Sequence, residues 1–276
     1  MRKAFALLSG GMDSTTCLHQ AILDYKPSNI SEHDIFEFMD NGSSPSFDKI
    51  DWVEAISIFY GQRHKKEMEF AKKTCDKLGI KHSILDIGDV LSGKMVMLTD
   101  ASRADVEVPN MSYDEIKGVS PTYVPFRNGT MLSCITAYAQ KWVNEQNKIH
   151  DAMIEKINLE GIGCDIDPKP SAGIYFGAHA EDAHNWAYPD CTPEFIGAMA
   201  NAIYIGSYMQ IRLHTPIQWS SKAQVVALGE TLSVRWEDTW SCYKGDEHHC
   251  GTCPTCRARK GAFQAAGVAD PTEYAA

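Results

Sequence analysis

The 276-residue chain lacks any apolar run that approaches the ~20 residues needed to cross a membrane as a helix. It also lacks the features of a signal peptide, because the first apolar run, residues 4–8, is short and leads directly into a glycine motif. We therefore expect a soluble, cytoplasmic protein without membrane partners. Hydrophobic residues make up 44% of the chain and charged residues 22%, a globular balance that argues against global disorder.

An excess of positive charge is also absent. The chain carries 36 Asp and Glu residues against 26 Lys and Arg residues, which gives a formal net charge of −10. Such a chain has no bulk basic field that would release counterions from nucleic acid. We therefore expect no direct partner among nucleic acids, although a local basic patch is compatible with this balance.

Strand-like and helix-like segments alternate along the chain. Residues 4–8 are typical of a parallel strand that is buried on both faces, and residues 15–25 have helical spacing of apolar side chains. Further strands are predicted over 54–60, 81–87 and 174–178, and further helices over 64–78, 130–146 and 194–208. This alternation predicts a Rossmann-like α/β fold, with a parallel sheet covered by helices on both faces.

Two polar stretches interrupt the alternation. Residues 27–51 are predicted to form a surface loop, and residues 144–171 a second insertion. The cysteine-rich segment from residue 240 onward is predicted to be a small module of its own. The expected organisation is a core domain over 1–239 and a separate cysteine-rich module over 240–276.

A Ser-Gly-Gly-Met-Asp-Ser turn, residues 9–14, joins the first predicted strand to the first helix. Its glycines allow a tight turn that presents N–H groups, and the helix N-terminus favours an anion. The hydroxyls of Ser9, Ser14 and Thr15 add donors, while Asp13 beside a phosphate indicates a bridging Mg²⁺ ion. The turn is neither a Walker A loop nor a G-x-G-x-x-G motif. It resembles the PP-loop of ATP pyrophosphatases; the alternative is an ordinary turn in which Ser14 caps the helix.

Nine cysteines divide unequally along the chain. Five are scattered, whereas four lie within fifteen residues: Cys242, Cys250, Cys253 and Cys256. Without a secretion signal, such a cluster is typical of a metal site rather than of disulfides. Four thiolates close a tetrahedral site with no open position, so we expect a structural Zn²⁺ ion.

Other ligands and metals are compatible with this segment. His248 and His249 are competing ligands for zinc, and an iron–sulfur cluster is an alternative to it. Arg257, Arg259 and Lys260 follow the cluster directly. We expect these cations to offset the excess negative charge of four thiolates.

Six motifs stand in a fixed order along the chain: residues 8–16, 60–64 with Glu67, 124–128, 188–191 with Glu194 and Phe195, 215–217 with Lys222, and 239–243. In this order they resemble the 7-cyano-7-deazaguanine synthase (QueC) family of the PP-loop ATP pyrophosphatase superfamily. The resemblance reaches as far as Phe263. It departs at residues 182–188, which read Asp-Ala-His-Asn-Trp-Ala-Tyr where the family usually shows Asp-Tyr-Ser-Gly-Tyr.

The resemblance implies a homodimeric ligase of the queuosine-type deazapurine pathway that uses ATP, Mg²⁺ and Zn²⁺. Such enzymes convert 7-carboxy-7-deazaguanine and ammonia to 7-cyano-7-deazaguanine through an adenylated carboxylate and an amide. Free ammonia is the expected donor, because the second residue is Arg2 and not the cysteine of an amino-terminal glutaminase. Three alternatives stay open: the same chemistry halting at the amide for DNA modification, a tRNA-thiolating PP-loop enzyme, and a non-enzymatic zinc-ribbon module that binds nucleic acid.

The motifs also suggest roles for individual residues. The expected nucleotide-binding residues are Leu8, Ser9, Gly10, Gly11, Met12, Asp13, Ser14, Thr15, Tyr60, Gly61 and Gln62. The expected catalytic charges are Asp13, His64, Arg127 and Lys222. The expected contacts to the deazaguanine are Asp182, Tyr188, Asp190 and Cys191.

Plainer structural roles compete with several of these assignments. Arg127 and Lys222 could form surface salt bridges, as could His64. Asp190 could cap the helix that begins near Thr192. Cys191 is expected to line the site rather than to act as a nucleophile, because a nucleophile needs a nearby base and a lowered pKa.

Overall fold

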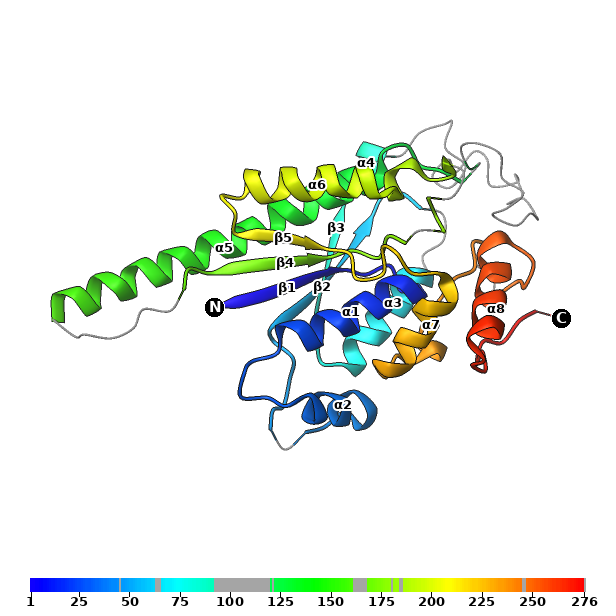
Figure 1. The fold of residues 1–276 in the computed structure, drawn as a ribbon, viewed down its shortest axis with the longest axis horizontal. Coiled ribbons are helices and arrows are strands. Elements are labelled where there is room, and N and C mark those ends of the chain that lie inside the picture. The colour runs from blue at the N-terminus through cyan, green and yellow to red at the C-terminus, as the bar shows by residue number, and fades with distance from the viewer. Residues whose placement is uncertain are drawn as a thin grey trace.

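The computed structural model describes residues 1–44, 46–62, 66–91, 120, 122–160, 168–179, 181–183, 186–244 and 247–275. Within these residues, five parallel strands form one sheet in the order β3-β2-β1-β4-β5 (Figure 1). The strands are β1 (Arg2–Leu7), β2 (Val53–Phe59), β3 (Lys81–Asp86), β4 (Ser171–Tyr175) and β5 (Ile211–His214). The predicted parallel α/β fold is confirmed, and β5 is an additional strand that the sequence pattern did not predict.

Helices cover both faces of the sheet (Figure 1). Ala4 and Ala6 of β1 belong to the apolar core on one face, whereas Phe5 and Leu7 belong to the core on the other, because successive side chains of a strand point to opposite faces. The first face packs against α1 (Met12–Tyr25), α2 (Glu32–Asn41), α3 (Lys66–Lys77) and α7 (Lys222–Thr231). The second packs against α5 (Arg127–Glu160) and α6 (Pro193–Gly206). The remaining elements are α4 (Gly88–Leu91), the 3₁₀ turns η4 (Pro189–Cys191) and η5 (Trp236–Asp238), and α8 (Pro254–Ala266), which packs on α7.

The stretch 27–51 contains α2, so the prediction of a surface loop there is wrong. The Ser31 side chain accepts a hydrogen bond from the Asp34 N–H, and the Asp34 carboxylate accepts one from the Ser31 N–H. This capping box starts the helix. Ile35 and Phe38 are then buried in the core beneath α1, so the segment contributes to the domain instead of merely connecting two strands.

The helix α5 has two unlike halves. Its buried side chains lie between Asn128 and Val143, close to the predicted span 130–146. Beyond Val143 the helix continues to Glu160 with Leu159 81% exposed, and this half projects past the sheet (Figure 1). Neither α5 nor any other helix of the described residues is both long and apolar enough to cross a membrane.

The order of the strands creates a crevice at the carboxyl ends of the two central strands β1 and β4. The chain runs from β1 outward through β2 to β3, and then places β4 and β5 on the other side of β1. The connections that leave the carboxyl ends of β1 and β4 therefore diverge. In open α/β sheets, ligands bind at such a switch point.

Candidate active site and four-cysteine cluster

A cavity of about 240 Å³ lies at the carboxyl ends of β1, β2 and β4. The predicted residues on its wall are Leu8, Ser9, Gly11, Met12, Asp13, Ser14, Tyr60, Gln62, Arg127, Asp182, Tyr188, Cys191 and Lys222. Gly10, Gly61 and Asp190 are not on this wall, and Thr15 borders a different cavity. His64 falls outside the described residues. The fold thus brings most of the predicted nucleotide, catalytic and substrate residues around one space.

The glycine turn after β1 is shaped by its own backbone. Gly10 has a φ of +87°, and a Cβ there would lie 2.2 Å from the carbonyl oxygen of Glu67, so only glycine fits. Gly11 is the N-cap of α1. The Ser9 N–H donates to the Ser14 Oγ at 3.1 Å, and this hydroxyl lies 3.2 Å from the Gly11 carbonyl oxygen, to which it donates. The turn therefore holds the start of α1, with its positive dipole end, against the cavity.

Charged side chains from three connections meet beside this turn. The Lys222 ammonium, at the start of α7, lies 2.7 Å from the Asp13 carboxylate. Asp182 follows β4 and lies 3.1 Å from the imidazole of His179. Burial alone would lower the pKa of Lys222, but the carboxylates of Asp13 and Asp182 raise it above its ordinary value. Burial alone would raise the pKa of Asp182, but His179 and Lys222 hold it well below its usual range.

The same cluster offers oxygen ligands for a cation. The Oδ1 atom of Asp13 is buried and has no hydrogen-bond partner among the described residues. Ligand atoms of Asp13, His179 and Asp182 all lie within 4.8 Å of one another. Carboxylate oxygens together with substrate phosphates are the ligands that Mg²⁺ prefers. The donor set therefore fits the expected divalent cation.

Arg127 enters the cavity from the start of α5. Its guanidinium donates to the Tyr60 hydroxyl at 3.3 Å and lies 5.6 Å from the centroid of that ring. Glu67, in the first turn of α3, also lies on the wall. Burial raises the pKa of Glu67 to about 7, and the nearby Arg127 limits the rise. The site therefore contains a fixed cation and a carboxyl group that can exchange a proton near neutral pH.

Two of the predicted substrate residues make hydrogen bonds to other residues of the protein. The Tyr188 hydroxyl lies 2.7 Å from the Thr122 hydroxyl and 3.1 Å from that of Ser120. The Asp190 carboxylate accepts a hydrogen bond from the Asn128 N–H at 2.9 Å. Asp190 therefore caps α5 and not α6, which is capped by Thr192. The interpretation of Asp190 as a cap was right in kind but named the wrong helix.

Cys191 lies on the cavity wall as a thiol. It is 6% exposed, and the Asn128 side-chain amide donates to its sulfur at 3.2 Å. Burial raises the pKa of Cys191, and the carboxylates of Asp182 and Asp190 raise it further. These surroundings disfavour a thiolate, in agreement with a lining role.

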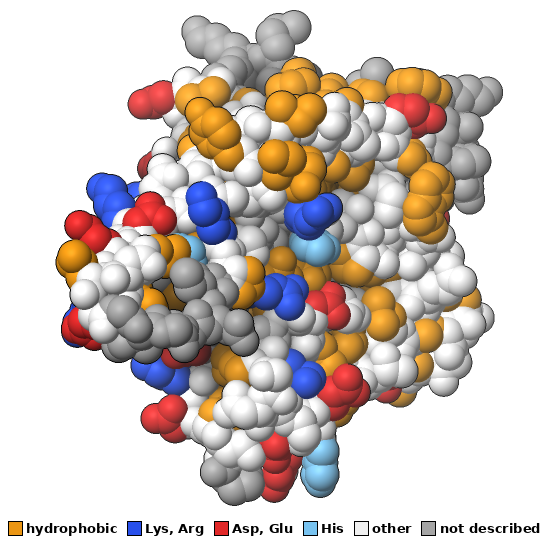
Figure 2. Space-filling view, turned by 60° about the vertical axis from the view of Figure 1, so that its left-hand side comes forward, with side chains coloured by type: hydrophobic (Ala, Val, Ile, Leu, Met, Phe, Trp, Pro, Cys, Tyr) orange, Lys and Arg blue, Asp and Glu red, His pale blue; other side chains and the backbone are white. Residues whose placement is uncertain are grey.

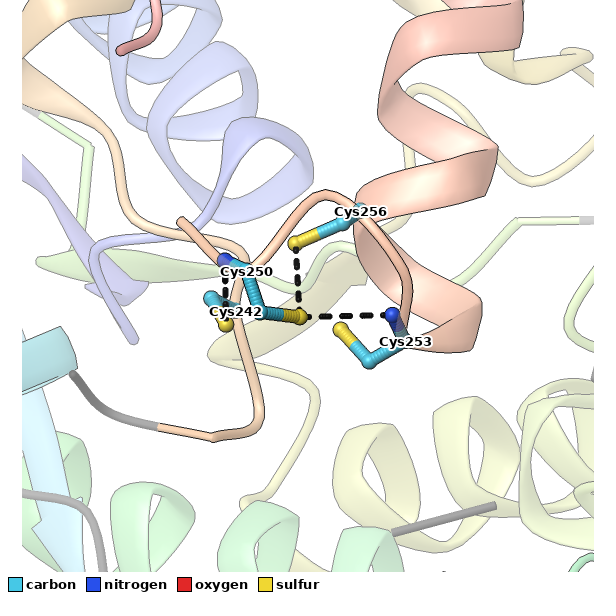
Figure 3. A group of neighbouring side chains, drawn as sticks. All are labelled: Cys242, Cys250, Cys253 and Cys256. Atoms are coloured by element: carbon cyan, nitrogen blue, oxygen red, sulfur yellow. Dashed lines mark hydrogen bonds between the residues drawn. The ribbon is translucent and has the colours of Figure 1, made fainter. Parts of the chain in front are cut away.

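The four clustered cysteines converge on one point (Figure 3). Their sulfurs all lie within 4.8 Å of one another, as the ligands of a single metal ion would. Backbone N–H groups donate to these sulfurs, from Cys250 to the Cys242 sulfur at 3.4 Å and from Cys253 to the Cys250 sulfur at 3.3 Å. Such donors stabilise thiolates, so the segment is already arranged for metal binding.

Neighbouring histidines and basic residues serve other contacts. His249 accepts a hydrogen bond at Nε2 from the Ser241 N–H, and its ring lies 4.1 Å from that of Trp240. Neither it nor His248 joins the group of four sulfurs. Arg259 is 1% exposed and bonds Asp270, Thr239 and Trp236. Arg259 therefore has Asp270 as its ion-pair partner, and its effect on the thiolates stays a prediction.

The cysteine segment also forms part of the cavity wall. Trp240 donates its backbone N–H to the Gly10 carbonyl at 2.8 Å, and Ser241, Tyr243 and Thr255 line the cavity. The sequence analysis assigned no role in the site to these residues or to His179. For the segment, the signals were its closeness to the first cysteine and the motif over 239–243; for His179, a lone histidine between alanines, there was none.

A glycine turn that leads from a buried parallel strand into a helix, beside a switch-point crevice, is the arrangement of nucleotide-binding α/β proteins. A family model described as "Queuosine biosynthesis protein QueC" matches residues 46–156 and 168–267. A 7-cyano-7-deazaguanine synthase from Marinomonas sp. is 34% identical over 274 residues, which cover 99% of each chain. One from Caldicellulosiruptor bescii is 36% identical over 272 residues, 99% of this chain and 97% of the relative. The chain belongs to the QueC family.

Among solved structures, the chain matches the U34-tRNA thiolase NcsA from Methanococcus maripaludis with its 4Fe-4S cluster. The two are 15% identical, the match covers 99% of this chain and 74% of that chain, and the TM-score is 0.33. This agreement is too low to support an argument about function.

Proposed function

We propose that the protein is an ATP-dependent 7-cyano-7-deazaguanine synthase acting on 7-carboxy-7-deazaguanine and ammonia. The observation that carries the proposal is the meeting of the glycine turn, Lys222 and Arg127 around one cavity in a chain of the QueC family. A carboxylate is a poor electrophile, and this cavity pairs a phosphate-binding turn with fixed cations. Those are the parts needed to convert a carboxylate to a mixed anhydride with AMP.

The proposed reaction uses two molecules of ATP. The substrate carboxylate attacks the α-phosphorus of the first ATP, so that pyrophosphate leaves and an acyl-adenylate forms. Ammonia attacks the acyl carbon, AMP leaves, and loss of a proton yields the amide. The amide oxygen then attacks the second ATP and displaces pyrophosphate. Departure of AMP and of both amide protons leaves the nitrile.

In this proposal the glycine turn holds the pyrophosphate portion of ATP through the backbone and the hydroxyls of Ser9 and Ser14. Lys222 and Arg127 neutralise phosphate charge that develops as the bond breaks. Asp13 would hold Mg²⁺, which supplies further charge neutralisation when bound. Its buried, unpartnered Oδ1 atom supports this role.

The other side of the cavity suits the remaining substrates. Tyr60 and Gln62, after β2, would border the adenosine, while Asp182, Tyr188 and Cys191 would face the deazaguanine. A carboxylate such as Asp182 can accept the N–H donors of a guanine-like edge. The four cysteines would hold a structural Zn²⁺ ion. We further propose a cytoplasmic homodimer.

The first experiment is mass spectrometry of the reaction product. Purified protein is incubated with 7-carboxy-7-deazaguanine, MgATP and ammonium, beside a reaction without ammonium and one with Lys222→Met. We expect the nitrile and AMP from the wild type only in the presence of ammonium. Accumulation of the amide would instead identify an enzyme that halts halfway. No AMP under any of these conditions would reject the ligase assignment, and tRNA thiolation would be tested next.

Direct nucleic-acid binding has little support from the surface. On the face shown in Figure 2, Lys and Arg side chains are interspersed with Asp and Glu. Near the four cysteines, the charge of Arg259 is already paired with Asp270. These observations favour a small-molecule substrate over the zinc-ribbon alternative.

A further inference from the structure

Glu67, the second residue of α3, lies on the wall of the cavity beside the glycine turn. Its backbone carbonyl oxygen would be 2.2 Å from a Cβ added to Gly10, so the first turn of α3 packs directly against the glycine turn. Beyond the effect of burial, the pKa of Glu67 depends on Arg127 of α5. The pKa of Tyr60, which follows β2, depends in the same way on Arg127 and on Glu67. The Glu67 carboxyl group therefore stands near the groups proposed to contact ATP.

This carboxyl group is available to a ligand. It makes no hydrogen bond or ion pair with the residues that the structure describes. The other two carboxylates on the wall have such neighbours, because Asp13 lies 2.7 Å from the Lys222 ammonium and Asp182 lies 3.1 Å from the His179 imidazole. The oxygen atoms of Glu67 can therefore accept N–H groups from a molecule bound in the cavity.

The ammonia step of the proposed reaction needs a proton acceptor in the cavity. At neutral pH, most of the ammonia in solution is ammonium, whose nitrogen has no lone pair with which to attack an acyl carbon. A base that is held beside the acyl-adenylate and has a pKa near the working pH can remove the extra proton.

Glu67 suits this task better than the other titratable groups on the described part of the wall. Lys222 stays protonated and Cys191 stays a thiol, because the pKa of each lies above its usual range. Asp182 is a weak base, because its pKa lies well below its usual range. Phenol and guanidinium groups do not take up protons at neutral pH. Burial raises the pKa of Glu67 to about 7, which gives it the base strength that the step needs.

We propose that Glu67 is a catalytic residue that binds ammonium at the cavity wall and takes one of its protons. An N–H bond of ammonium breaks, its electron pair stays on nitrogen, and Glu67 becomes a carboxylic acid. The lone pair of the resulting ammonia forms the C–N bond to the acyl carbon, and the C–O bond to AMP breaks with its electron pair on AMP. The nitrogen and Glu67 then each release one proton to solvent. This assignment rests on the proposed function, because it concerns the ammonia step of that reaction.

The first test compares two nucleophiles. Glu67→Gln removes the base, and Glu69→Gln, which alters an exposed carboxylate in the same turn of α3, is the matched control. Hydroxylamine is the second nucleophile, because it is largely unprotonated at neutral pH and converts an acyl-adenylate to a hydroxamate. We expect Glu67→Gln to lower kcat/KM for ammonium at neutral pH by about 10²- to 10⁴-fold, and hydroxamate formation by less than tenfold. Equal losses with both nucleophiles, or no loss with ammonium, would overturn the proposal.

The second test follows kcat/KM for total ammonium as a function of pH. In the wild type we expect a rise up to the pKa of Glu67, about 7, and a plateau above it, because the carboxylate is the active form. In Glu67→Gln the value should keep rising at higher pH, because only free ammonia then reacts. The same profile in both proteins would overturn the proposal.

The two tests also separate this assignment from the proposed function. If the wild type forms neither hydroxamate nor AMP, the proposed function and the assignment of Glu67 fail together. If the wild type forms both products and Glu67→Gln keeps its rate with ammonium, only the assignment of Glu67 fails.

Discussion

Two neighbouring segments of the cavity wall, joined by a hydrogen bond from Trp240 to Gly10, are held in shape by different means. The turn over residues 9–14 is fixed by glycine, by backbone hydrogen bonds and by the helix that it starts. The described residues of the segment 240–256 bring four side-chain sulfurs to one point, where they could hold a metal ion. Neighbouring residues determine the shape of the first segment, whereas under the proposed function a metal ion would hold the second. One wall of the cavity should therefore survive loss of metal and the other should not.

The two segments are joined at the first turn of α3. Glu67 presents its carbonyl to Gly10, and Phe70, one helical turn later, packs its ring 5.3 Å from that of Trp240. Trp240 also donates to the Gly10 carbonyl. A change in either segment should therefore affect the structure of the other. Four measurements can separate the effect on the altered segment from the effect on its neighbour.

The largest effect is expected from loss of a sulfur. Cys253→Ala should abolish metal binding and disorder residues 240–256, because a structural metal site supplies folding free energy. With this part of the wall lost, we expect nucleotide affinity to fall by about 10- to 100-fold. Metal analysis, hydrogen exchange and ATP titration measure the three effects. Cys134→Ala, outside the cluster, is the control. Unchanged nucleotide affinity in a metal-free variant would contradict the dependence of the cavity wall on metal.

Gly10→Ala should damage the glycine turn and leave metal binding by the cysteine segment in place. The new Cβ would lie 2.2 Å from a backbone oxygen, which cannot move without displacing α3. We expect the free energy of unfolding to fall by about 2–4 kcal/mol and ATP binding to be lost. Gly11→Ala is the matched control, because its Cβ would be 3.4 Å from the Ser9 hydroxyl. Similar losses in both variants would contradict the assignment of Gly10.

A smaller loss of stability is expected when the ion pair between Arg259 and Asp270 is broken. Arg259→Gln leaves the buried end of Asp270 without its cation, which costs about 3 kcal/mol in such pairs. Since Arg259 is paired with Asp270 and is not among the metal-ligating groups, we expect the metal content to stay unchanged. Urea unfolding and metal analysis on one sample test both statements. A fall in metal content at unchanged stability would mean that this charge does offset the sulfurs.

The smallest effect concerns pH and Glu67. The native state keeps this proton to about pH 7, whereas the unfolded chain loses it near the ordinary pKa of 4.5. Between these values unfolding releases a proton, so rising pH favours the unfolded state. The free energy of unfolding should fall by about 1–3 kcal/mol from pH 5 to pH 8, and Glu67→Gln should flatten this slope. An unchanged slope in Glu67→Gln would assign the pH dependence to another group.

Whether a feature could be predicted from the sequence depends on how far apart in the chain the interacting residues are. The first strand, the glycine turn and the four-cysteine cluster were predictable because each depends on residues close together in the chain. The partner of Asp190 is Asn128, 62 residues away, and no local pattern reveals which helix a carboxylate caps. His179 comes close to Asp13 only when β4 is placed beside β1. The helix α2 is an exception, because its capping box and its apolar spacing are both local and were hidden by the polar composition around them.

The hydrogen bond from Trp240 to Gly10 also has a consequence for folding during synthesis, because it joins two residues that are far apart in the chain. The glycine turn over residues 9–14 leaves the ribosome early, yet the segment of the cavity wall that adjoins it is made 230 residues later. At about 5–20 residues per second, the turn waits roughly 10–50 s before the site can close. During that interval ATP cannot stabilise the nascent chain through a finished pocket. Chaperones and proteases therefore encounter the nascent chain before the wall of the cavity is complete.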